Sequence, residues 1–245
     1  MEERKEIRFL NSFLVYTDHL DKINADEHLL ISTLNSYSLI LSQKDDVFRH
    51  ALIQSDILLP DGISIVLAAR FLYGYKFPKI AGADLFYYQM SRLNKNSGKC
   101  FFLGSSDVVL NLICKRASIE FPNVTIKTYS PPFKTEFSID DNRSMVEIIN
   151  HFCPDVLFIG LTAPKQEKWA FAHFHSINAK HVCSIGAVFD FYAGTVKRAP
   201  VWMIKSGLEW CYRLISEPRR LWRRYLLGNI SFIWLIIKNK FIVQP

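Results

Sequence analysis

The stretch from Pro154 to Pro200 constrains the fold of this 245-residue chain more than any other part. It opens with a short apolar run, Val156 to Ile159, which ends at a glycine and is typical of a buried parallel strand. A helix can begin at Pro164, and a second apolar run, Val182 to Ile185, follows it. Strand, polar loop, helix and strand in this order predict a βαβ unit.

We expect binding chemistry in the loops that follow these two strands, because ligands of parallel sheets bind outside the carboxyl ends of the strands. Gln166 lies in a polar turn after the first strand. Asp190 follows the second strand, in a segment from Phe189 to Phe191 that we expect to be a loop. Neither side chain has an evident structural duty, so both are candidate substrate-binding residues.

Further strands and helices alternate along the chain before this unit. The first strand that the pattern supports begins at Leu29. Apolar runs predict strands at 29–33, 57–59, 99–103 and 124–129. Helices are predicted at 45–54, 63–72 and 141–152; another is introduced by 79–85, and one more follows the strand at 99–103 and ends at about residue 119. This alternation predicts an α/β fold with a mostly parallel sheet and flanking helices.

Two of these strands end in residues that can bind a ligand or simply shape a turn. Asp61 lies between the strand at 57–59 and a helix; on position alone, an N-cap is the interpretation that we favour. Gly104 and the two serines after it precede another helix, and small residues there let backbone amides face a phosphate. The same three residues are ordinary turn chemistry, so both interpretations stay open.

Positive charge is concentrated in the last fifth of the chain. Residues 196–245 hold ten Lys and Arg and two Asp and Glu, a balance of +8, whereas residues 1–195 have a balance of −1. The apolar pattern predicts three helices in this tail, at 201–216, 219–227 and 230–237. The last is far shorter than the ~20 residues that span a bilayer, so we expect it in the membrane interface, with Trp234 as an anchor. A tail this basic and apolar indicates an anionic partner.

The arginines of this tail leave two interpretations open. They can form a solvated basic face that favours anionic lipid by about 1 kcal/mol each. Some of their guanidinium groups can instead bind a diphosphate in a bidentate manner. Different members of the set can do both; the set is Arg213, Arg220, Arg223 and Arg224.

Several classes of protein and site have no support in the sequence. Five cysteines, without any C-x-x-C spacing, indicate a reduced cytosolic protein rather than a disulfide framework or a zinc site. The charged N-terminus lacks the apolar run of a signal peptide. No G-x-G-x-x-G, Walker or D-x-D motif supports a dinucleotide, a P-loop nucleotide or a carboxylate-bound metal. Nucleic-acid binding is not expected, because the core is not basic and lacks helix-turn-helix or RNP-like sequences.

Six stretches together carry a resemblance to a known family. They are LLPDGISIVLAAR (58–70), KIAGADL (79–85), FFLGSS (101–106), PDVLFIGLTAPKQEKWA (154–170), IGAVFDFYAGTVKRAP (185–200) and GLEWCYRLISEPRRLWRRYL (207–226). Through them the chain resembles the WecG/TagA/CpsF glycosyltransferases, glycosyltransferase family 26, over about residues 10 to 228. The motifs PKQE, FDF-x-AG-x-x-x-RAP and EW-x-YRL-x-x-EP-x-R, in this order, are highly specific.

The resemblance implies an inverting, metal-independent hexosyltransferase without a cofactor. Such an enzyme moves a sugar from a UDP-sugar donor to a polyprenyl-diphosphate-linked sugar in cell-surface polysaccharide synthesis. In the best-known branch, N-acetylmannosamine goes onto GlcNAc-diphospho-undecaprenol through a β-1,4 link. Other donors stay open, namely UDP-N-acetylmannosamine uronate, UDP-glucuronate and UDP-glucose. A more distant alternative is a non-catalytic basic membrane adaptor.

The fold implied by the resemblance is Rossmann-like and GT-E-like. A catalytic core at 1–195 carries a C-terminal helical appendage at 196–245, which completes the active site at the membrane. We expect a cytoplasmic protein, peripheral on the inner face of the bacterial cytoplasmic membrane, with an anionic membrane surface as a partner; a homo-oligomer stays open. Removal of 196–245 should leave a folded, more soluble and inactive core.

The resemblance also assigns roles to residues. The family's base falls on Asp61, accompanied by Thr33 and Asn35. A general base held in place contributes about 10²–10⁴ in rate. Without a metal, the negative charge on the departing UDP must be stabilised by arginine side chains or helix N-termini. Lys79 stands where the family usually has Arg, which keeps the charge but loses the bidentate fork. The remaining substrate-binding positions fall on Gln166, Arg213, Arg220 and Arg223.

Overall fold

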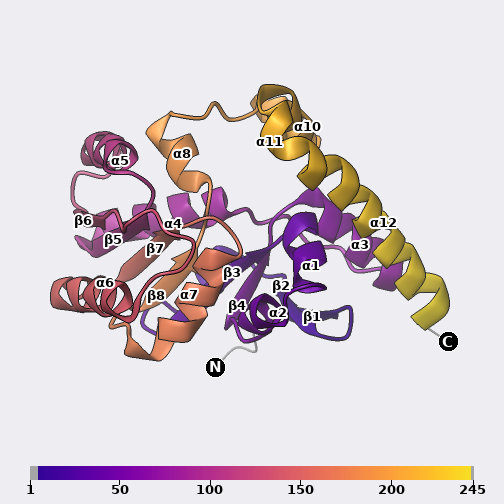
Figure 1. The fold of residues 1–245 in the computed structure, drawn as a ribbon, viewed down its shortest axis with the longest axis horizontal. Helices are drawn as coiled ribbons and strands as arrows, with labels where there is room; N and C mark the ends of the chain where they lie inside the picture. Colours follow the sequence, from indigo (N-terminus) through magenta and orange to yellow (C-terminus); the bar gives the residue numbers. More distant parts are fainter. Residues whose placement is uncertain (1–4, 244–245) are drawn as a thin grey trace.

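The computed structural model describes residues 5–243, without the side chains of residues 205, 220, 223, 224, 242 and 243. Its centre is a sheet with the strand order β1-β2-β4-β3-β8-β7-β5-β6 (Figure 1). β1 and β2 pair antiparallel, and the other neighbouring strands are parallel, so the predicted mostly parallel sheet is confirmed. The strands are β1 (Glu6–Phe9), β2 (Phe13–Tyr16), β3 (Leu29–Leu34), β4 (Ile57–Pro60), β5 (Lys99–Gly104), β6 (Thr125–Tyr129), β7 (Val156–Gly160) and β8 (His181–Ser184).

Helices connect the strands and cover both faces of the sheet. Alternate residues of one strand serve the two faces, because successive side chains of a strand point in opposite directions. Ile57 and Leu59 of β4 pack in the apolar cluster with α4 and α8, whereas Leu58 packs in the cluster with α2 and α3. The helices are α1 (Ser36–Ser42), α2 (Asp46–Ile53), α3 (Ile63–Tyr73), α4 (Gly82–Asn96), α5 (Asp107–Glu120), α6 (Ile139–Phe152), α7 (Lys165–His173) and α8 (Val188–Ala193).

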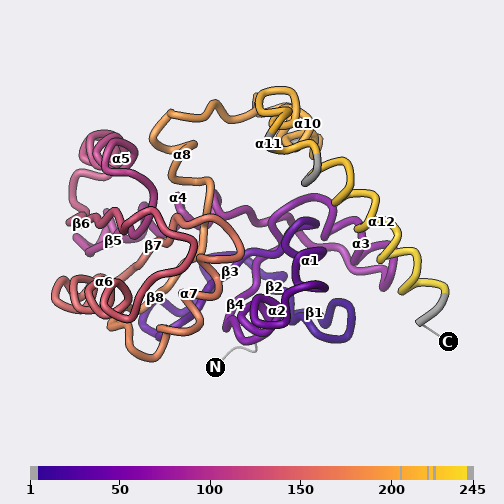
Figure 2. Tube along the Cα trace, viewed as in Figure 1, coloured from indigo at the N-terminus to yellow at the C-terminus, as the bar shows by residue number. Residues whose placement is uncertain are grey.

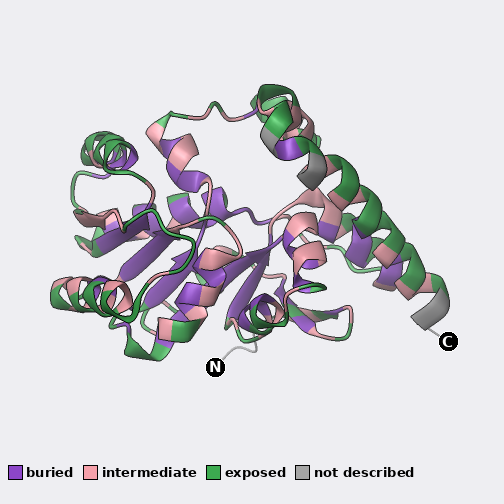
Figure 3. Ribbon diagram, in the orientation of Figure 1, coloured by how far each residue is buried: buried purple, intermediate pink, exposed green. Residues whose placement is uncertain are grey.

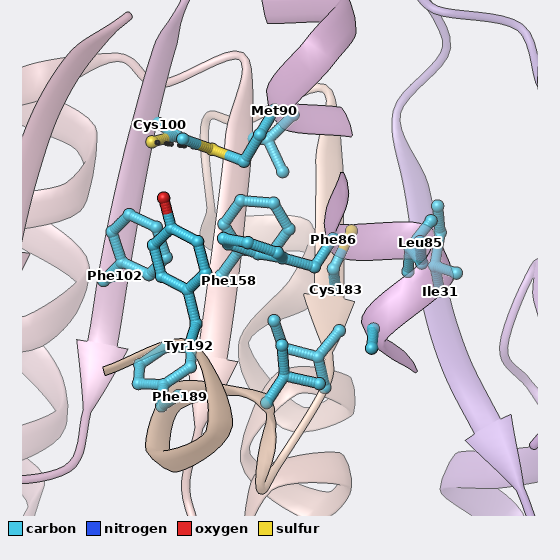
Figure 4. Packing of buried hydrophobic residues seen from close by; sticks show 14 of the residues in the cluster. Ile31, Leu85, Phe86, Met90, Cys100, Phe102, Phe158, Cys183, Phe189 and Tyr192 are labelled. Carbon is cyan, nitrogen blue, oxygen red and sulfur yellow. Dashed lines mark hydrogen bonds between the residues drawn. The ribbon is translucent and has the colours of Figure 1, made fainter. Parts of the chain in front are cut away.

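Aromatic side chains fill the space between the sheet, α4 and α8 (Figure 4). The rings of Phe102 on β5 and Phe158 on β7 stack with their centroids 5.3 Å apart. The rings of Phe86 on α4 and Tyr192 on α8 lie 4.6 Å apart. Offset aromatic contacts of this kind add to the burial of apolar area. This packing holds α8 against the end of the sheet, and so it positions Asp190, which lies on α8.

The hairpin of β1 and β2 is not anticipated by the sequence pattern, which first supports a strand at Leu29. Each strand of the hairpin has four residues, and Leu10 and Asn11 form the turn with positive φ. Strands this short, with charged residues in β1, give little periodic signal. The expectation of a first strand at Leu29 is therefore wrong.

The helix expected at 201–216 is in fact two helices, α9 (Val201–Lys205) and α10 (Glu209–Ser216). Gly207 separates them because it adopts φ +74°, a conformation that favours glycine. A side chain at this position would also come within 2.6 Å of Ile63. The turn between α9 and α10 therefore packs closely on the beginning of α3.

The helices predicted at 219–227 and 230–237 are not separate, because the chain stays helical through Gly228. α11 (Pro218–Trp222), a π-helical turn (Arg223–Leu227), α12 (Gly228–Lys238) and a second π-helical turn (Asn239–Val243) follow one another without a break. A glycine inside a helix costs only about 1 kcal/mol. Burial of Phe232 and Ile236 on α12 outweighs this cost.

The C-terminal helices return to the sheet rather than extend away from it. After α8 the chain crosses to α9 and α10, and α12 then runs beside α1 and α3 (Figures 1 and 2). The inner stripe of α12 is buried and its outer face is exposed (Figure 3). Phe232 and Ile236 share an apolar cluster with Leu39 of α1 and Ala68 of α3. Within residues 5–243, no helix is both long enough and apolar enough to cross a membrane.

Candidate active site

A cavity of about 890 Å³ opens where β3, β4, β7 and β8 end, and the C-terminal helices close its opposite side. This is the edge at which parallel sheets bind their ligands. Segments from both ends of the chain therefore meet around one space. Of the residues that the sequence analysis selects, the cavity is lined by Thr33, Asn35, Asp61, Lys79, Gln166, Asp190 and Arg213.

Thr33 and Asn35 come from the end of β3. Thr33 is buried, and Asn35 is the N-cap of α1. The Asn35 Oδ1 accepts a hydrogen bond from the Ser38 N–H (3.0 Å), and the Ser38 Oγ accepts one from the Asn35 N–H (2.8 Å). This capping box fixes the Asn35 side chain. Its oxygen is engaged by the helix, so its amide NH₂ is the part that can donate to a ligand.

Asp61 lies on the neighbouring loop, between β4 and α3, and is half-buried in the cavity wall. Its N–H donates 2.9 Å hydrogen bonds to the carbonyl oxygens of Leu34 and Leu59. The N-cap of α3 is Gly62, with φ +129° and no side-chain cap. The N-cap interpretation of Asp61, favoured on position alone, is therefore wrong. The carboxylate instead faces the cavity that Asn35 also lines.

Gln166 and Glu167 begin α7 and are buried, at 4% and 3% exposure. The Gln166 Nε2 donates to the Glu167 Oε1 at 2.8 Å. The Gln166 Oε1 is buried and has no hydrogen-bond partner among the described residues. Gly186, two residues after the end of β8, leaves room beside this amide: a Cβ there would lie 3.4 Å from the Gln166 Nε2. A buried acceptor without a partner is costly, so this oxygen is suited to receive a donor from a bound ligand.

Asp190 lies on α8, so the loop predicted from Phe189 to Phe191 is a short helix instead. The Thr195 hydroxyl donates to the Asp190 carbonyl oxygen (3.2 Å) and to its Oδ1 (3.4 Å). The next residue, Phe191, presents its ring 5.2 Å from the Arg213 guanidinium carbon on α10. This cation–π contact joins the sheet side of the cavity to its helical side.

Arg213 provides the helical wall with a buried donor. Its Nε is buried and has no hydrogen-bond partner in the part of the chain that the structure describes. The predicted partners Arg220 and Arg223 lie on the following helical turns, and their side chains fall outside the described residues. Within the described chain, no group of three or more His, Cys, Asp or Glu side chains is arranged to hold a metal ion.

Comparison with known proteins places these features in one family. The model of the glycosyl transferase WecG/TagA/CpsF family matches residues 11–244, which is nearly the whole chain. The chain belongs to the WecG/TagA/CpsF family. The resemblance carried by the six sequence stretches is thereby confirmed.

Three similar proteins are 26% to 34% identical to the chain over the aligned residues. The N-acetylglucosaminyldiphosphoundecaprenol N-acetyl-beta-D-mannosaminyltransferase of Bacillus subtilis strain 168 is 34% identical over 223 residues, covering 90% of this chain and 85% of that protein. The proteins of the same name from Bacillus spizizenii and Staphylococcus aureus MRSA252 are 30% and 26% identical. These matches cover 96% and 87% of this chain, and 90% and 81% of the two proteins.

Two charged residues of this WecG/TagA/CpsF protein are site residues that sequence reasoning did not select. Arg198 and Glu209 line the cavity and form an ion pair of 3.3 Å. Arg198 lies in the linker after α8, and Glu209 begins α10, so the pair ties the helical side to the sheet side. The signal was present in the RAP and EW-x-YRL motifs, which contain both residues. Glu167 of the PKQE motif also lines the cavity, and the motif alone gives it no role.

Gly104 does not line the cavity. Among the candidate site residues that the structure describes in full, it is the only one that does not. A Cβ at Gly104 would come within 2.7 Å of the Gly160 carbonyl oxygen, so close strand packing accounts for the glycine. The Ser106 Oγ caps α5 by accepting from the Val109 N–H, and the Ser105 carbonyl accepts from the Ser130 hydroxyl. These contacts are the ordinary turn chemistry that the Gly-Ser-Ser sequence allows.

Proposed function

We propose that this family member transfers N-acetylmannosamine from its UDP derivative to N-acetylglucosaminyl-diphospho-undecaprenol, with inversion at the anomeric carbon. The names of the similar Bacillus and Staphylococcus proteins support the acceptor and the sugar. The observation that carries the proposal is a single cavity lined by the carboxylate of Asp61, the buried acceptor of Gln166 and the guanidinium of Arg213.

The Asp61 carboxylate acts as the general base in this proposal. It takes the proton from the acceptor hydroxyl while that oxygen attacks the anomeric carbon of the donor. The bond from this carbon to the diphosphate oxygen breaks on the opposite face, and UDP leaves with the bonding electrons. Attack and departure on opposite faces produce inversion. A general base held in place supplies about 10²–10⁴ of the rate.

The departing diphosphate gains negative charge, and cations of the cavity stabilise it. Arg213 presents a buried N–H without a partner among the described residues, which a phosphate oxygen can satisfy. Lys79 lines the same cavity and adds a point charge rather than a fork. We assign Arg220 and Arg223 to the same task, because they follow Arg213 on the adjoining helical turns.

The outer face of the C-terminal helices suits contact with a membrane surface. Trp202 on α9, Trp234 on α12 and Phe241 after α12 are exposed, and the Lys238 ammonium lies 5.2 Å from the Trp234 ring. Exposed aromatic rings beside lysines are typical of helices that lie in the membrane interface. We propose that this face rests on the anionic inner surface of the cytoplasmic membrane, where a lipid-linked acceptor is found.

A donor panel with the full-length protein in detergent tests the proposal. UDP release is measured with N-acetylglucosaminyl-diphospho-undecaprenol and with UDP-N-acetylmannosamine, its uronate, UDP-glucuronate or UDP-glucose. We expect the highest kcat/KM for UDP-N-acetylmannosamine and a β-linked disaccharide by NMR. Release of UDP with another donor at a higher kcat/KM would reassign the sugar. No acceptor-dependent release from any donor would favour the basic membrane adaptor.

A further inference from the structure

The cavity has a polar end and an apolar arm. The polar end lies at the loops after β3 and β4, around Asn35 and Asp61. The arm runs between α3 and α12, and its walls carry only hydrocarbon side chains: Leu67, Ala68 and Phe71 from α3, and Phe232, Ile233, Ile236 and Ile237 from α12. None of the residues assigned to base or diphosphate chemistry lies on this arm. It therefore needs a separate explanation.

One face of the C-terminal helix lines the cavity along most of its length. The lining positions recur every three or four residues, with adjacent pairs at 232/233 and 236/237, which is the pattern of a single helical face: Leu221, Tyr225, Asn229, Phe232, Ile233, Ile236 and Ile237. The chemistry changes at Asn229, whose Oδ1 accepts a 3.4 Å hydrogen bond from the Ser36 hydroxyl beside the polar end. From Asn229 to Ile237 the face is apolar over about 12 Å.

The walls of the arm are open, whereas its floor is closed. Leu67 on α3 and Ile233 on α12 are 54% and 56% exposed although both line the cavity. Phe232 and Ile236 beneath them are buried in the core. Large apolar side chains that line a cavity yet stay half exposed gain free energy when a hydrocarbon ligand covers them.

Lys240 closes the far end of the arm and holds its two walls together. The Lys240 ammonium donates a 3.0 Å hydrogen bond to the Leu72 carbonyl oxygen at the end of α3. It also lies 5.8 Å from the Phe71 ring, within the range of a cation–π contact. These two contacts join α3 to the helical turn after α12 at this end of the arm.

We propose that the groove between α3 and α12 binds the first isoprenoid units of the acceptor lipid. The proposal rests on the proposed function, which supplies a diphosphate-linked prenol as acceptor. The groove begins at the polar end of the cavity, where Asn229 meets Ser36, and continues from there with apolar side chains. A polar head group joined to a hydrocarbon chain matches this order of polar and apolar surface.

This placement gives the apolar arm a role in orienting the acceptor. A chain held between α3 and α12 leaves the cavity at the outer face of the C-terminal helices, where Trp234 is exposed. Its diphosphate then lies where the groove meets the polar end of the cavity, and the sugar beyond it is directed toward Asp61. Binding energy from the lipid is thereby used to position the hydroxyl that reacts.

Two matched variants on one helix test the groove. Ile233→Glu places a charge in the groove, whereas Ile230→Glu places it at an equally exposed isoleucine that does not line the cavity. In detergent, wild type should prefer the undecaprenyl acceptor over a hexyl-diphosphate acceptor with the same sugar. Ile233→Glu should lower this ratio of kcat/KM values about tenfold and leave the KM for the UDP-sugar unchanged. Ile230→Glu should keep the ratio of wild type.

Direct binding separates failure of the groove from failure of the proposed reaction. Farnesyl diphosphate should bind the full-length protein at least tenfold more tightly than inorganic diphosphate, and Ile233→Glu should abolish this advantage. Leu67→Glu on the opposite wall repeats the test, with thermal unfolding as the check that both variants fold. Equal losses in Ile233→Glu and Ile230→Glu, or no farnesyl advantage in wild type, would overturn the groove. A farnesyl advantage without any turnover would retain the groove and reject the reaction.

Discussion

The backbone N–H of Asp61 donates a 2.9 Å hydrogen bond to the carbonyl oxygen of Leu34, and so joins the end of β4 to the end of β3. The two loops that follow these strands then begin side by side. Gly62 takes φ +129° immediately afterwards, which turns the chain into α3 without using the Asp61 side chain as a cap. Backbone hydrogen bonds of Asp61 thus fix the place of its carboxylate in the cavity wall. Because Gly62 and not Asp61 is the N-cap of α3, a change of the carboxylate removes no helix cap.

Asp61→Asn should therefore lower kcat by about 10²–10⁴ while the protein remains folded. The amide has nearly the same shape and retains the backbone hydrogen bond, but it cannot take a proton. The KM or Kd of the UDP-sugar should change only a few-fold, because the donor does not need a base to bind. Steady-state UDP release and donor binding measure the two effects. Asp46→Asn, at an exposed position of α2, is the control, and turnover of Asp61→Asn within a few-fold of wild type would exclude the base.

Arg213→Lys should weaken the hold on the leaving group while it preserves the charge. Lysine cannot reproduce the planar fork of donors. It also has no nitrogen at the buried position that the Arg213 Nε occupies, so that donor is removed. We expect kcat/KM to fall by about 10- to 100-fold and the inhibition constant of UDP to rise, since UDP carries the charge that Arg213 contacts. Arg219→Lys is the matched control, because Arg219 is exposed on α11 and does not line the cavity. An unchanged inhibition constant in Arg213→Lys would contradict this role.

The central strands and their loops could be predicted from the sequence because their residues are buried on both faces of a parallel sheet. Val156 to Ile159 is an uninterrupted apolar run for that reason, and β7 includes it. A loop at the carboxyl end of such a strand is then a binding position by topology, which is how Gln166 and Asp190 could be selected. That α8 is a helix could not be foreseen, because six residues give no helical periodicity.

The helical side of the site was less accessible to sequence reasoning, since its form depends on contacts with distant segments. Gly207, where the helix breaks at φ +74°, packs against Ile63, about 140 residues earlier in the chain. The apolar groove exists only when Ile233 is brought opposite Leu67. A pattern within either helix shows an exposed isoleucine or leucine but not its partner. The division into a core at 1–195 and an appendage at 196–245 stays a prediction.

His181 should make the stability of the fold depend on pH. It is buried at the start of β8, where its Nε2–H donates to the Asn24 carbonyl oxygen (2.9 Å) and its Nδ1 accepts from the Gln89 NH₂ group (2.7 Å). The orientation of the Gln89 amide is fixed, because its oxygen accepts a 3.1 Å hydrogen bond from the Arg92 Nε. Its NH₂ group therefore faces His181. Burial, aided by the charges of Arg92 and Lys180, lowers the pKa of His181 to about 4.

The folded protein therefore binds fewer protons at His181 than the unfolded chain between about pH 6.5 and pH 4. Its contribution to stability is complete above pH 6.5 and falls as the pH drops through this window, by about 2 kcal/mol at pH 5. Urea unfolding at pH 7 and pH 5 measures the difference. His181→Asn should reduce the difference by roughly that amount, whereas His175→Asn, at an exposed position, should leave it unchanged. An equal pH dependence in His181→Asn and wild type would reject this assignment.

Phe232→Ala should destabilise the whole protein, although Phe232 lies in the C-terminal appendage. Its ring is 7% exposed and packs in the cluster that contains Leu39 and Ala68, whereas Phe241, in the helical turn that follows α12, is 73% exposed. Truncation of a buried phenylalanine costs about 3–5 kcal/mol, and truncation of an exposed one costs little. Thermal and urea unfolding should show one cooperative transition, lowered in Phe232→Ala and unchanged in Phe241→Ala. Loss of a separate minor transition, with the main one intact, would mean that 196–245 folds apart from the core and that its removal leaves the core stable.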